Sequence, residues 1–126
     1  MRLLLDTHIL LWWLADDPSL PNGAKAAIGS ASSAVFVSAA TVWEIAVNCA
    51  LRKLEFPVAR IAEILAAEGF EPLAIETHHA VGAGALPPCH DDPFDRMLVA
   101  QALHEPLRLL TADTALYAYS DTIIQI

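Results

Sequence analysis

The chain begins with an uninterrupted apolar run, Leu3 to Leu5, that stops at a carboxylate, Asp6. A strand with one face in water alternates apolar and polar side chains, so consecutive leucines predict a strand buried on both faces. Such strands belong to parallel sheets that are covered by helices on both sides. Asp6 would then lie at the carboxyl end of the strand, which is the edge where ligands bind in open α/β sheets.

Four further short segments have the composition of strands, at 34–37 (ending on Ser38), 70–75, 107–110 and 122–126. Helical patterns separate them at 8–15, 21–30, 39–51, 58–68, 77–84, 92–103 and 114–119. This alternation predicts the α/β class, with a mostly parallel sheet of about five strands. Pro72 favours an edge position for the third strand, and the length of 126 residues predicts a single domain over 1–126.

Composition limits the kinds of partner. The apolar fraction of 56% exceeds the usual value of about 45–50%, which predicts an interface with a second copy, a partner chain, or both. The net charge of −8, from 15 acidic and 7 basic side chains, argues against tight non-specific binding to nucleic acid, which needs Lys and Arg on phosphates. It is compatible with catalysis on nucleic acid if acids in one pocket hold cations that reverse the local field.

The cysteines and the apolar runs bear on location. Cys49 and Cys89 match no metal spacing and no disulfide framework, which favours a reducing cytosol. The early apolar run at 9–15 is too short to cross a bilayer, and Asp6 and His8 interrupt the faint likeness to a signal peptide. We expect a soluble cytoplasmic protein with no membrane partner.

Four acids fall where a predicted strand gives way to a helix, or just inside that helix: Asp6, Glu44, Asp95 and Asp113. Each has an ordinary explanation as part of a helix start. Thr41 and Glu44 fit a capping box, Asp92 fits an N-cap ahead of Pro93, and the other acids could cap or compensate a helix dipole. Taken singly, capping is the simpler interpretation of every one of them.

Taken together, the four acids favour a metal site. Carboxylates gathered at one sheet edge repel each other, and such repulsion persists mainly where a metal ion or a raised pKa relieves it. Oxygen ligands suit Mg²⁺ or Mn²⁺, and no cluster of Cys or His argues for zinc. Because carboxylate-held divalent ions are a standard device for phosphodiester hydrolysis, the residues alone point to metal-dependent phosphoryl chemistry, with capping as the open alternative.

Four segments in order along the chain resemble the successive motifs of a PIN-domain ribonuclease: LLDTH at 4–8, SAATVWEIA at 38–46, HDDPFDRMLVAQA at 90–102 and LLTAD at 109–113. More narrowly, they resemble the VapC toxins of prokaryotic type II toxin–antitoxin modules. The segment around Asp95 is the most specific. The resemblance implies a three-layer α/β/α PIN-like fold, a homodimer, cleavage of RNA, and a cognate VapB-like antitoxin whose C-terminal segment lies across the active site.

Carried onto this chain, the resemblance implies an acidic set that is both catalytic and metal-binding, for Mg²⁺ or Mn²⁺: Asp6, Glu44, Asp95 and Asp113. Asp92 is an additional candidate ligand, and an N-cap explains it about as well. Two departures, Asn48 and Asp91, stand where relatives often carry a basic residue. Both remove positive charge near the cleft and so bear on substrate affinity and activity.

Polar neighbours of the acids suggest supporting roles. The hydroxyls of Thr7 and Thr111 could orient a carboxylate or a metal-bound water, or could make local turn hydrogen bonds instead. Arg96 could contact an RNA phosphate or pair with a neighbouring acid. Among the histidines, His90 is the candidate acid or base because it lies near the acidic helix start.

The remaining histidines and the tryptophans have simpler interpretations. We expect a solvated helix start for the adjacent pair His78 and His79, and no neighbouring histidine for His104. The three tryptophans, Trp12, Trp13 and Trp43, could stack on bases, but their apolar neighbours favour the core or a dimer interface. Two other functions remain open: a catalytically inactive acidic module that docks a basic partner, and a structure-specific DNA nuclease on the same fold.

Overall fold

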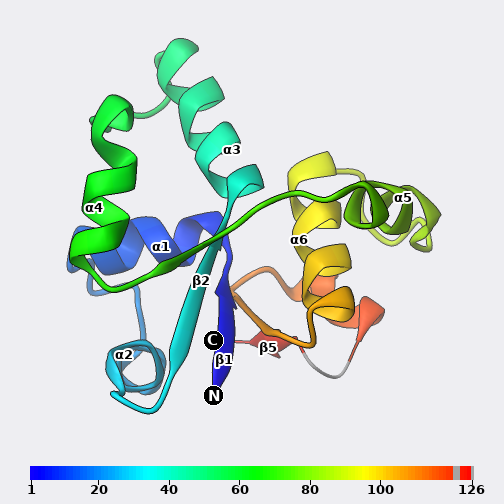
Figure 1. Ribbon diagram of the computed structural model, residues 1–126, viewed down its shortest axis with the longest axis horizontal. Coiled ribbons are helices and arrows are strands. Elements are labelled where there is room, and N and C mark those ends of the chain that lie inside the picture. The colour runs from blue at the N-terminus through cyan, green and yellow to red at the C-terminus, as the bar shows by residue number, and fades with distance from the viewer. Residues whose placement is uncertain (121–122, 126) are drawn as a thin grey trace.

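Parallel strands form the centre of the molecule. The computed structural model describes residues 1–120 and 123–125, and these residues form a five-stranded sheet of order β3-β2-β1-β4-β5 in which every described pairing is parallel (Figure 1). The strands are β1 (Arg2–Leu5), β2 (Ala34–Ser38), β3 (Glu71–Leu73), β4 (Arg108–Thr111) and β5 (Ile124–Gln125). The predicted parallel sheet and the edge position of the third strand are confirmed.

Helices cover both faces of this sheet. Within the described residues they are α1 (Thr7–Leu14), α2 (Asn22–Gly29), α3 (Ala39–Ala50), α4 (Ile61–Ala67), α5 (Thr77–Ala85) and α6 (Pro93–His104), with 3₁₀ helices η1 (Val58–Arg60) and η2 (Thr114–Tyr119). Figure 1 shows α1, α2 and α4 on one side and α6 on the other, with α5 outside it and α3 rising from the end of β2. The predicted three-layer arrangement is confirmed.

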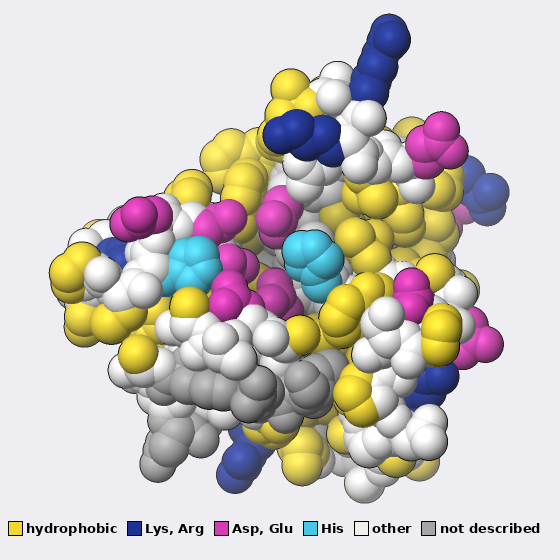
Figure 2. All heavy atoms as spheres, turned by 180° about the vertical axis from the view of Figure 1, so that it is seen from behind, with side chains coloured by type: hydrophobic (Ala, Val, Ile, Leu, Met, Phe, Trp, Pro, Cys, Tyr) yellow, Lys and Arg dark blue, Asp and Glu magenta, His cyan; other side chains and the backbone are white. Residues whose placement is uncertain are grey.

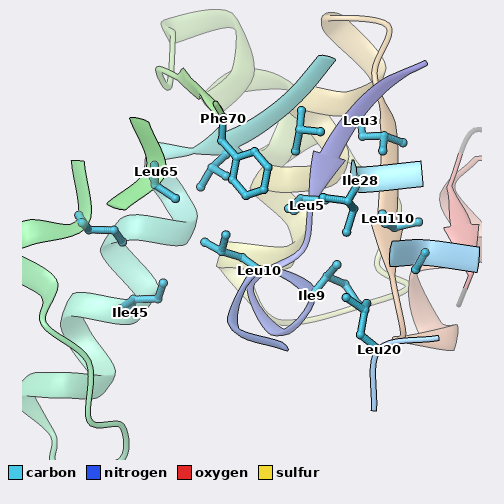
Figure 3. Packing of buried hydrophobic residues seen from close by; sticks show 14 residues of the cluster. Leu3, Leu5, Ile9, Leu10, Leu20, Ile28, Ile45, Leu65, Phe70 and Leu110 are labelled. Atoms are coloured by element: carbon cyan, nitrogen blue, oxygen red, sulfur yellow. The ribbon is translucent and has the colours of Figure 1, made fainter. Parts of the chain in front are cut away.

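The leucines of β1 explain why the sheet needs two layers of helices. Leu3 and Leu5 point into a core that also contains Leu10, from α1 (Figure 3), while Leu4 points into a second core with Leu98 of α6. All three β1 leucines are fully buried. Since burial on each face removes apolar area from water, neither face tolerates a polar residue, which accounts for the missing alternation.

Several boundaries differ from the sequence-based predictions. The helix expected over 58–68 is divided into η1 and α4, and the strand expected over 70–75 is only Glu71–Leu73. The helix expected over 77–84 is Thr77–Ala85, with Glu76 as its N-cap. Of the strand expected over 122–126, residues 122 and 126 lie outside the described residues, and β5 occupies Ile124–Gln125.

Among the described residues, no helix is long and apolar enough to cross a membrane.

Candidate active site

The carboxyl edge of the sheet gathers the predicted acids. Because β1, β2 and β4 are parallel, their ends lie at the same edge, and a carboxylate follows each of them directly or in the next helix. A hollow of about 320 Å³ opens there. Its lining consists of Asp6, His8, Trp12, Glu44, Asp92, Asp95, Ala112 and Asp113. Figure 2 shows acidic and histidine side chains together around this hollow.

Three of the acids also cap helices. Asp6 accepts from the Thr7 backbone N–H at the start of α1, and Asp113 accepts from the Ala115 N–H at the start of η2. Asp92 accepts from two backbone N–H groups at the start of α6. Capping and a place in the hollow are therefore compatible, because the free oxygens of a capping carboxylate remain available.

The capping box predicted for Thr41 and Glu44 is wrong. Helix α3 begins at Ala39, directly after β2, and its N-cap is Ser38, whose side chain accepts from the Ala40 N–H at 2.9 Å. Glu44 therefore lies in the second turn, too far along the helix to reach back to the cap. Its carboxylate is held instead by the Thr7 hydroxyl, which donates to Oε1 at 2.6 Å.

Two threonine hydroxyls hold carboxylates in place. Thr7 Oγ1 donates to Glu44, as described above, and lies 3.3 Å from Thr41 Oγ1. Thr111 Oγ1 donates to Asp6 Oδ2 at 2.6 Å and accepts from the Asp113 N–H at 3.0 Å. Each hydroxyl thus fixes the orientation of an acid that belongs to another element, as groups behind metal ligands do.

His90 lies between two acids. Its Nε2 is 3.0 Å from Asp113 Oδ2 and 3.2 Å from Asp95 Oδ2, and its Nδ1 accepts the Asp92 backbone N–H at 3.0 Å. In the neutral ring, the proton is therefore on Nε2 and faces the two carboxylates. The hydrogen bond with Asp113 raises the pKa of His90.

Burial and mutual repulsion perturb the acids. Burial raises the pKa of Asp95 to about 7, with further increases from the charges of Asp6 and Asp92. Burial also raises the pKa values of Asp6 and Glu44, although hydrogen bonds from the threonine hydroxyls oppose the change. At Asp113, burial is outweighed by the hydrogen bonds from His90 and a backbone N–H, so that its pKa is lowered.

Comparison with known proteins identifies the family. The family model described as "PIN domain" matches residues 3–121. This chain belongs to the PIN-domain family. It is also a homologue of the VapC ribonucleases, because it is 30% identical over 118 residues to Ribonuclease VapC22 of Mycobacterium tuberculosis (strain ATCC 25618 / H37Rv), covering 92% of this chain and 90% of that protein.

Two solved structures share the fold of this PIN domain. One is VapBC2 from Rickettsia felis bound to a DNA fragment from their promoter, with a TM-score of 0.72, 14% identity and coverage of 100% of this chain and 98% of that chain. The other is a toxin–antitoxin complex from Klebsiella pneumoniae, with a TM-score of 0.68, 22% identity and coverage of 98% of both chains. At these identities the likeness establishes the PIN fold alone.

The donor set in the PIN domain fits an oxygen-preferring cation. Asp6, Glu44, Asp92, Asp95 and Asp113 supply carboxylate oxygens to one hollow, and Mg²⁺ and Mn²⁺ favour such ligands. Burial, with repulsion from neighbouring acids, raises the pKa values of Asp6, Glu44 and Asp95, so the ionised forms of these three carboxylates are disfavoured. A bound cation would supply compensating positive charge.

Hydrogen bonds within the chain hold the guanidinium of Arg96. Its guanidinium donates to the carbonyl oxygens of Ala83, Leu86, Pro87 and His90, at 2.8 to 3.3 Å, and to the Tyr119 hydroxyl at 3.3 Å. No acid pairs with it in the described part of the chain. These hydrogen bonds favour a structural role for Arg96, in holding the segment that carries His90, over the predicted contact with an RNA phosphate.

Other side chains also lie differently from expectation. His8 and Trp12 line the hollow, and only their proximity to Asp6 in sequence could have indicated this. Trp13 packs on the core as predicted, whereas Trp43 is 60% exposed and contacts Phe94 edge-on with ring centres 5.0 Å apart. The solvated start expected for His78 and His79 is wrong for His79, which is fully buried.

Proposed function

We propose that this chain is a metal-dependent endoribonuclease and the toxin of a VapBC-type toxin–antitoxin module. The observation that carries the proposal is the convergence of Asp6, Glu44, Asp95 and Asp113 on one hollow at the carboxyl edge of the sheet. The ribonuclease name of the 30% identical relative supports the same activity. We propose hydrolysis of RNA phosphodiester bonds as the reaction.

The acids would hold Mg²⁺ or Mn²⁺, with Asp92 as a further candidate ligand. When bound, the ion supplies positive charge for the scissile phosphate and the leaving oxygen. Thr7 and Thr111 keep Glu44 and Asp6 in fixed orientations through 2.6 Å hydrogen bonds. His90 holds a proton on Nε2 beside Asp95 and Asp113, where it could act as a general acid or base.

We further propose a cognate antitoxin as the protein partner, a homodimer, and a cytoplasmic location. The two solved structures that share the fold come from toxin–antitoxin assemblies. An apolar groove has Trp43 and Val42 in its lining, both from α3, the helix that carries Glu44. The large exposed apolar side chains of Leu51 and Val81 add surface of the kind that interfaces cover.

The test is cleavage of a mixed, structured RNA pool with Mg²⁺, with Mn²⁺ and with EDTA. Wild type, Asp95→Asn and Asp16→Asn are compared after each is confirmed to be folded. Asp16 is the matched control, because the same acid-to-amide change occurs on an exposed side chain outside the hollow. We expect metal-dependent cleavage by wild type and Asp16→Asn, and a loss of at least 100-fold in Asp95→Asn.

Two outcomes would contradict the proposal. Equal cleavage by wild type and Asp95→Asn would leave the acids as caps or as a docking surface. Preferential cleavage of DNA in a competition with RNA of the same sequence would indicate a DNA nuclease on this fold.

A further inference from the structure

A cluster of side chains that could hold a metal ion lies at the opposite end of α6 from the active site. Three of the five histidines in the chain, His78, His79 and His104, have ring centres 4.2, 5.5 and 6.2 Å apart, and two of them, His78 and His79, contact Glu105. Helix α6 begins beside the hollow, at Asp92, and ends at this cluster. Its 12 residues separate the two places by roughly 18 Å, so the cluster is distinct from the active site.

The ligand atoms converge on one carboxylate oxygen. Glu105 Oε2 lies 3.3 Å from His78 Nε2 and 2.6 Å from His79 Nε2, and one ligand atom from each of the three residues lies within 4.8 Å of the others. Ligands 2.0–2.1 Å from a tetrahedral Zn²⁺ are roughly 3.3 Å apart. The two distances from Glu105 Oε2 to the histidine nitrogens therefore need to change by less than about 1 Å to admit the ion.

One side of the cluster is buried in the protein, and the other side is exposed to solvent. The His79 side chain is 1% exposed, whereas those of Glu105 and His78 are 34% and 56% exposed. Helices α5 and α6 can approach here because Gly82 has no side chain. A Cβ at that position would lie 2.5 Å from Cε1 of His104, whose Nδ1 donates to the Ala100 carbonyl at 2.8 Å.

The donor types select the class of ion. Two imidazole nitrogens and one carboxylate oxygen suit Zn²⁺ and other first-row ions that accept nitrogen ligands, and do not suit Mg²⁺. We propose that His78, His79 and Glu105 form a second metal site, for Zn²⁺ or a similar ion, which joins the start of α5 to the end of α6. This proposal does not depend on the ribonuclease activity.

Binding at His79 requires a change of tautomer. At present, Nδ1 of His79 accepts the Glu76 backbone N–H at 3.0 Å, so the ring proton is on Nε2 and faces Glu105. Ligation through Nε2 moves that proton to Nδ1 and replaces the bond from the Glu76 N–H. The ring remains neutral and no proton is released, and the Glu76 N–H gives up its present acceptor.

The test measures Zn²⁺ binding by isothermal titration calorimetry on untagged protein. All variants carry Asp95→Asn, because His90, Asp95 and Asp113 in the hollow could also hold an ion. In this background we expect one Zn²⁺ per chain with a Kd in the micromolar range, and a higher Tm when Zn²⁺ is present. His78→Gln and Glu105→Gln should each weaken binding at least tenfold and remove the Tm increase.

Matched controls separate ligation from folding effects. His8→Gln and Glu71→Gln make the same chemical changes away from the cluster and should keep the affinity. Glu105→Gln still offers an oxygen to the His79 N–H, and the exposed His78 side chain makes one long hydrogen bond, to Glu105, so both variants should fold. Absence of Zn²⁺ binding in the background, unchanged affinity in His78→Gln and Glu105→Gln, or loss of binding in His8→Gln would each overturn the proposal.

Discussion

Thr111 Oγ1 donates to Asp6 Oδ2 at 2.6 Å, which joins two residues 105 positions apart in the chain. The two side chains meet because β1 and β4 are neighbours in the sheet and end at the same edge. This buried hydrogen bond favours the ionised form of Asp6 and opposes the increase in pKa caused by burial. The orientation and charge of an active-site acid thus depend on a hydroxyl from another strand.

Replacing Thr111 by valine should impair the site more than the fold. Valine keeps the shape but leaves Asp6 without its hydroxyl partner, so we expect about 10- to 100-fold weaker Mg²⁺ activation and a loss of about 1 kcal/mol in the free energy of unfolding. The measurement is the Mg²⁺ concentration for half-maximal cleavage. Thr77→Val, on an exposed residue of α5, is the control. An unchanged Mg²⁺ dependence would show that Asp6 does not need this hydroxyl.

The raised pKa of Asp95 predicts that the metal-free protein is less stable at high pH. The folded-state pKa of about 7 lies above the ordinary value of 3.8, so the folded state binds this proton more tightly than the unfolded state. The contribution of Asp95 to stability therefore falls as pH rises between about 4 and 7. Burial and the neighbouring acids cause this loss, and a bound cation should reverse it.

Asp95→Asn removes the charge and should stabilise the metal-free protein. In EDTA at pH 8, we expect its free energy of unfolding to exceed that of wild type by on the order of 1 kcal/mol. The difference should shrink toward pH 5 and below. Urea unfolding at several pH values measures it, and Mg²⁺ at pH 8 should stabilise wild type more than Asp95→Asn. A higher free energy of unfolding for wild type than for Asp95→Asn, in EDTA at pH 8, would contradict this prediction.

Local sequence could predict the centre of the fold and the position of most of the acids. The run from Leu3 to Leu5 indicates a strand buried on both faces, and parallel strands bring their ends, including Asp6 and Asp113, to one edge. Local sequence could not predict where α3 begins, because Ser38 and Thr41 both fit an N-cap. The choice depends on β2, which continues to Ser38 and leads directly into the helix.

Contacts between distant segments account for the remaining errors. His79 is buried because Glu105, 26 residues away, meets it where α5 packs on α6. Arg96 is occupied by carbonyl oxygens of the segment that precedes α6, whose path no periodic pattern indicates. The roles of His79 and Arg96 can be assigned only when the packing of the elements that carry them and their partners is known.

Asp92 allows its roles as cap and as ligand to be separated. Its Oδ1 accepts from the backbone N–H groups of Phe94 and Asp95 at 2.8 and 3.2 Å. Asparagine can keep this cap, so Asp92→Asn should unfold like wild type, whereas Asp92→Ala should lose about 1 kcal/mol. If capping is the main role, cleavage by Asp92→Asn stays within about tenfold of wild type. A loss as large as that of Asp95→Asn, with unchanged stability, would identify Asp92 as an essential ligand.

Arg96 should matter for stability and not for RNA affinity. Its five hydrogen bonds join α6 to the end of α5, to the segment between these helices and to η2, and Arg96→Gln would leave several carbonyl oxygens without donors. We expect a loss of about 2–3 kcal/mol in the free energy of unfolding. Lysine should restore little of it, because an ammonium cannot reproduce the planar arrangement of donors.

Steady-state kinetics well below the Tm distinguish this role from phosphate binding. KM for RNA should stay within about twofold of wild type in Arg96→Gln, because both terminal nitrogens of the guanidinium already donate within the protein. Arg108→Gln, on an exposed side chain of β4, controls for the loss of one positive charge. A tenfold higher KM in Arg96→Gln with unchanged stability would instead place Arg96 on the RNA backbone.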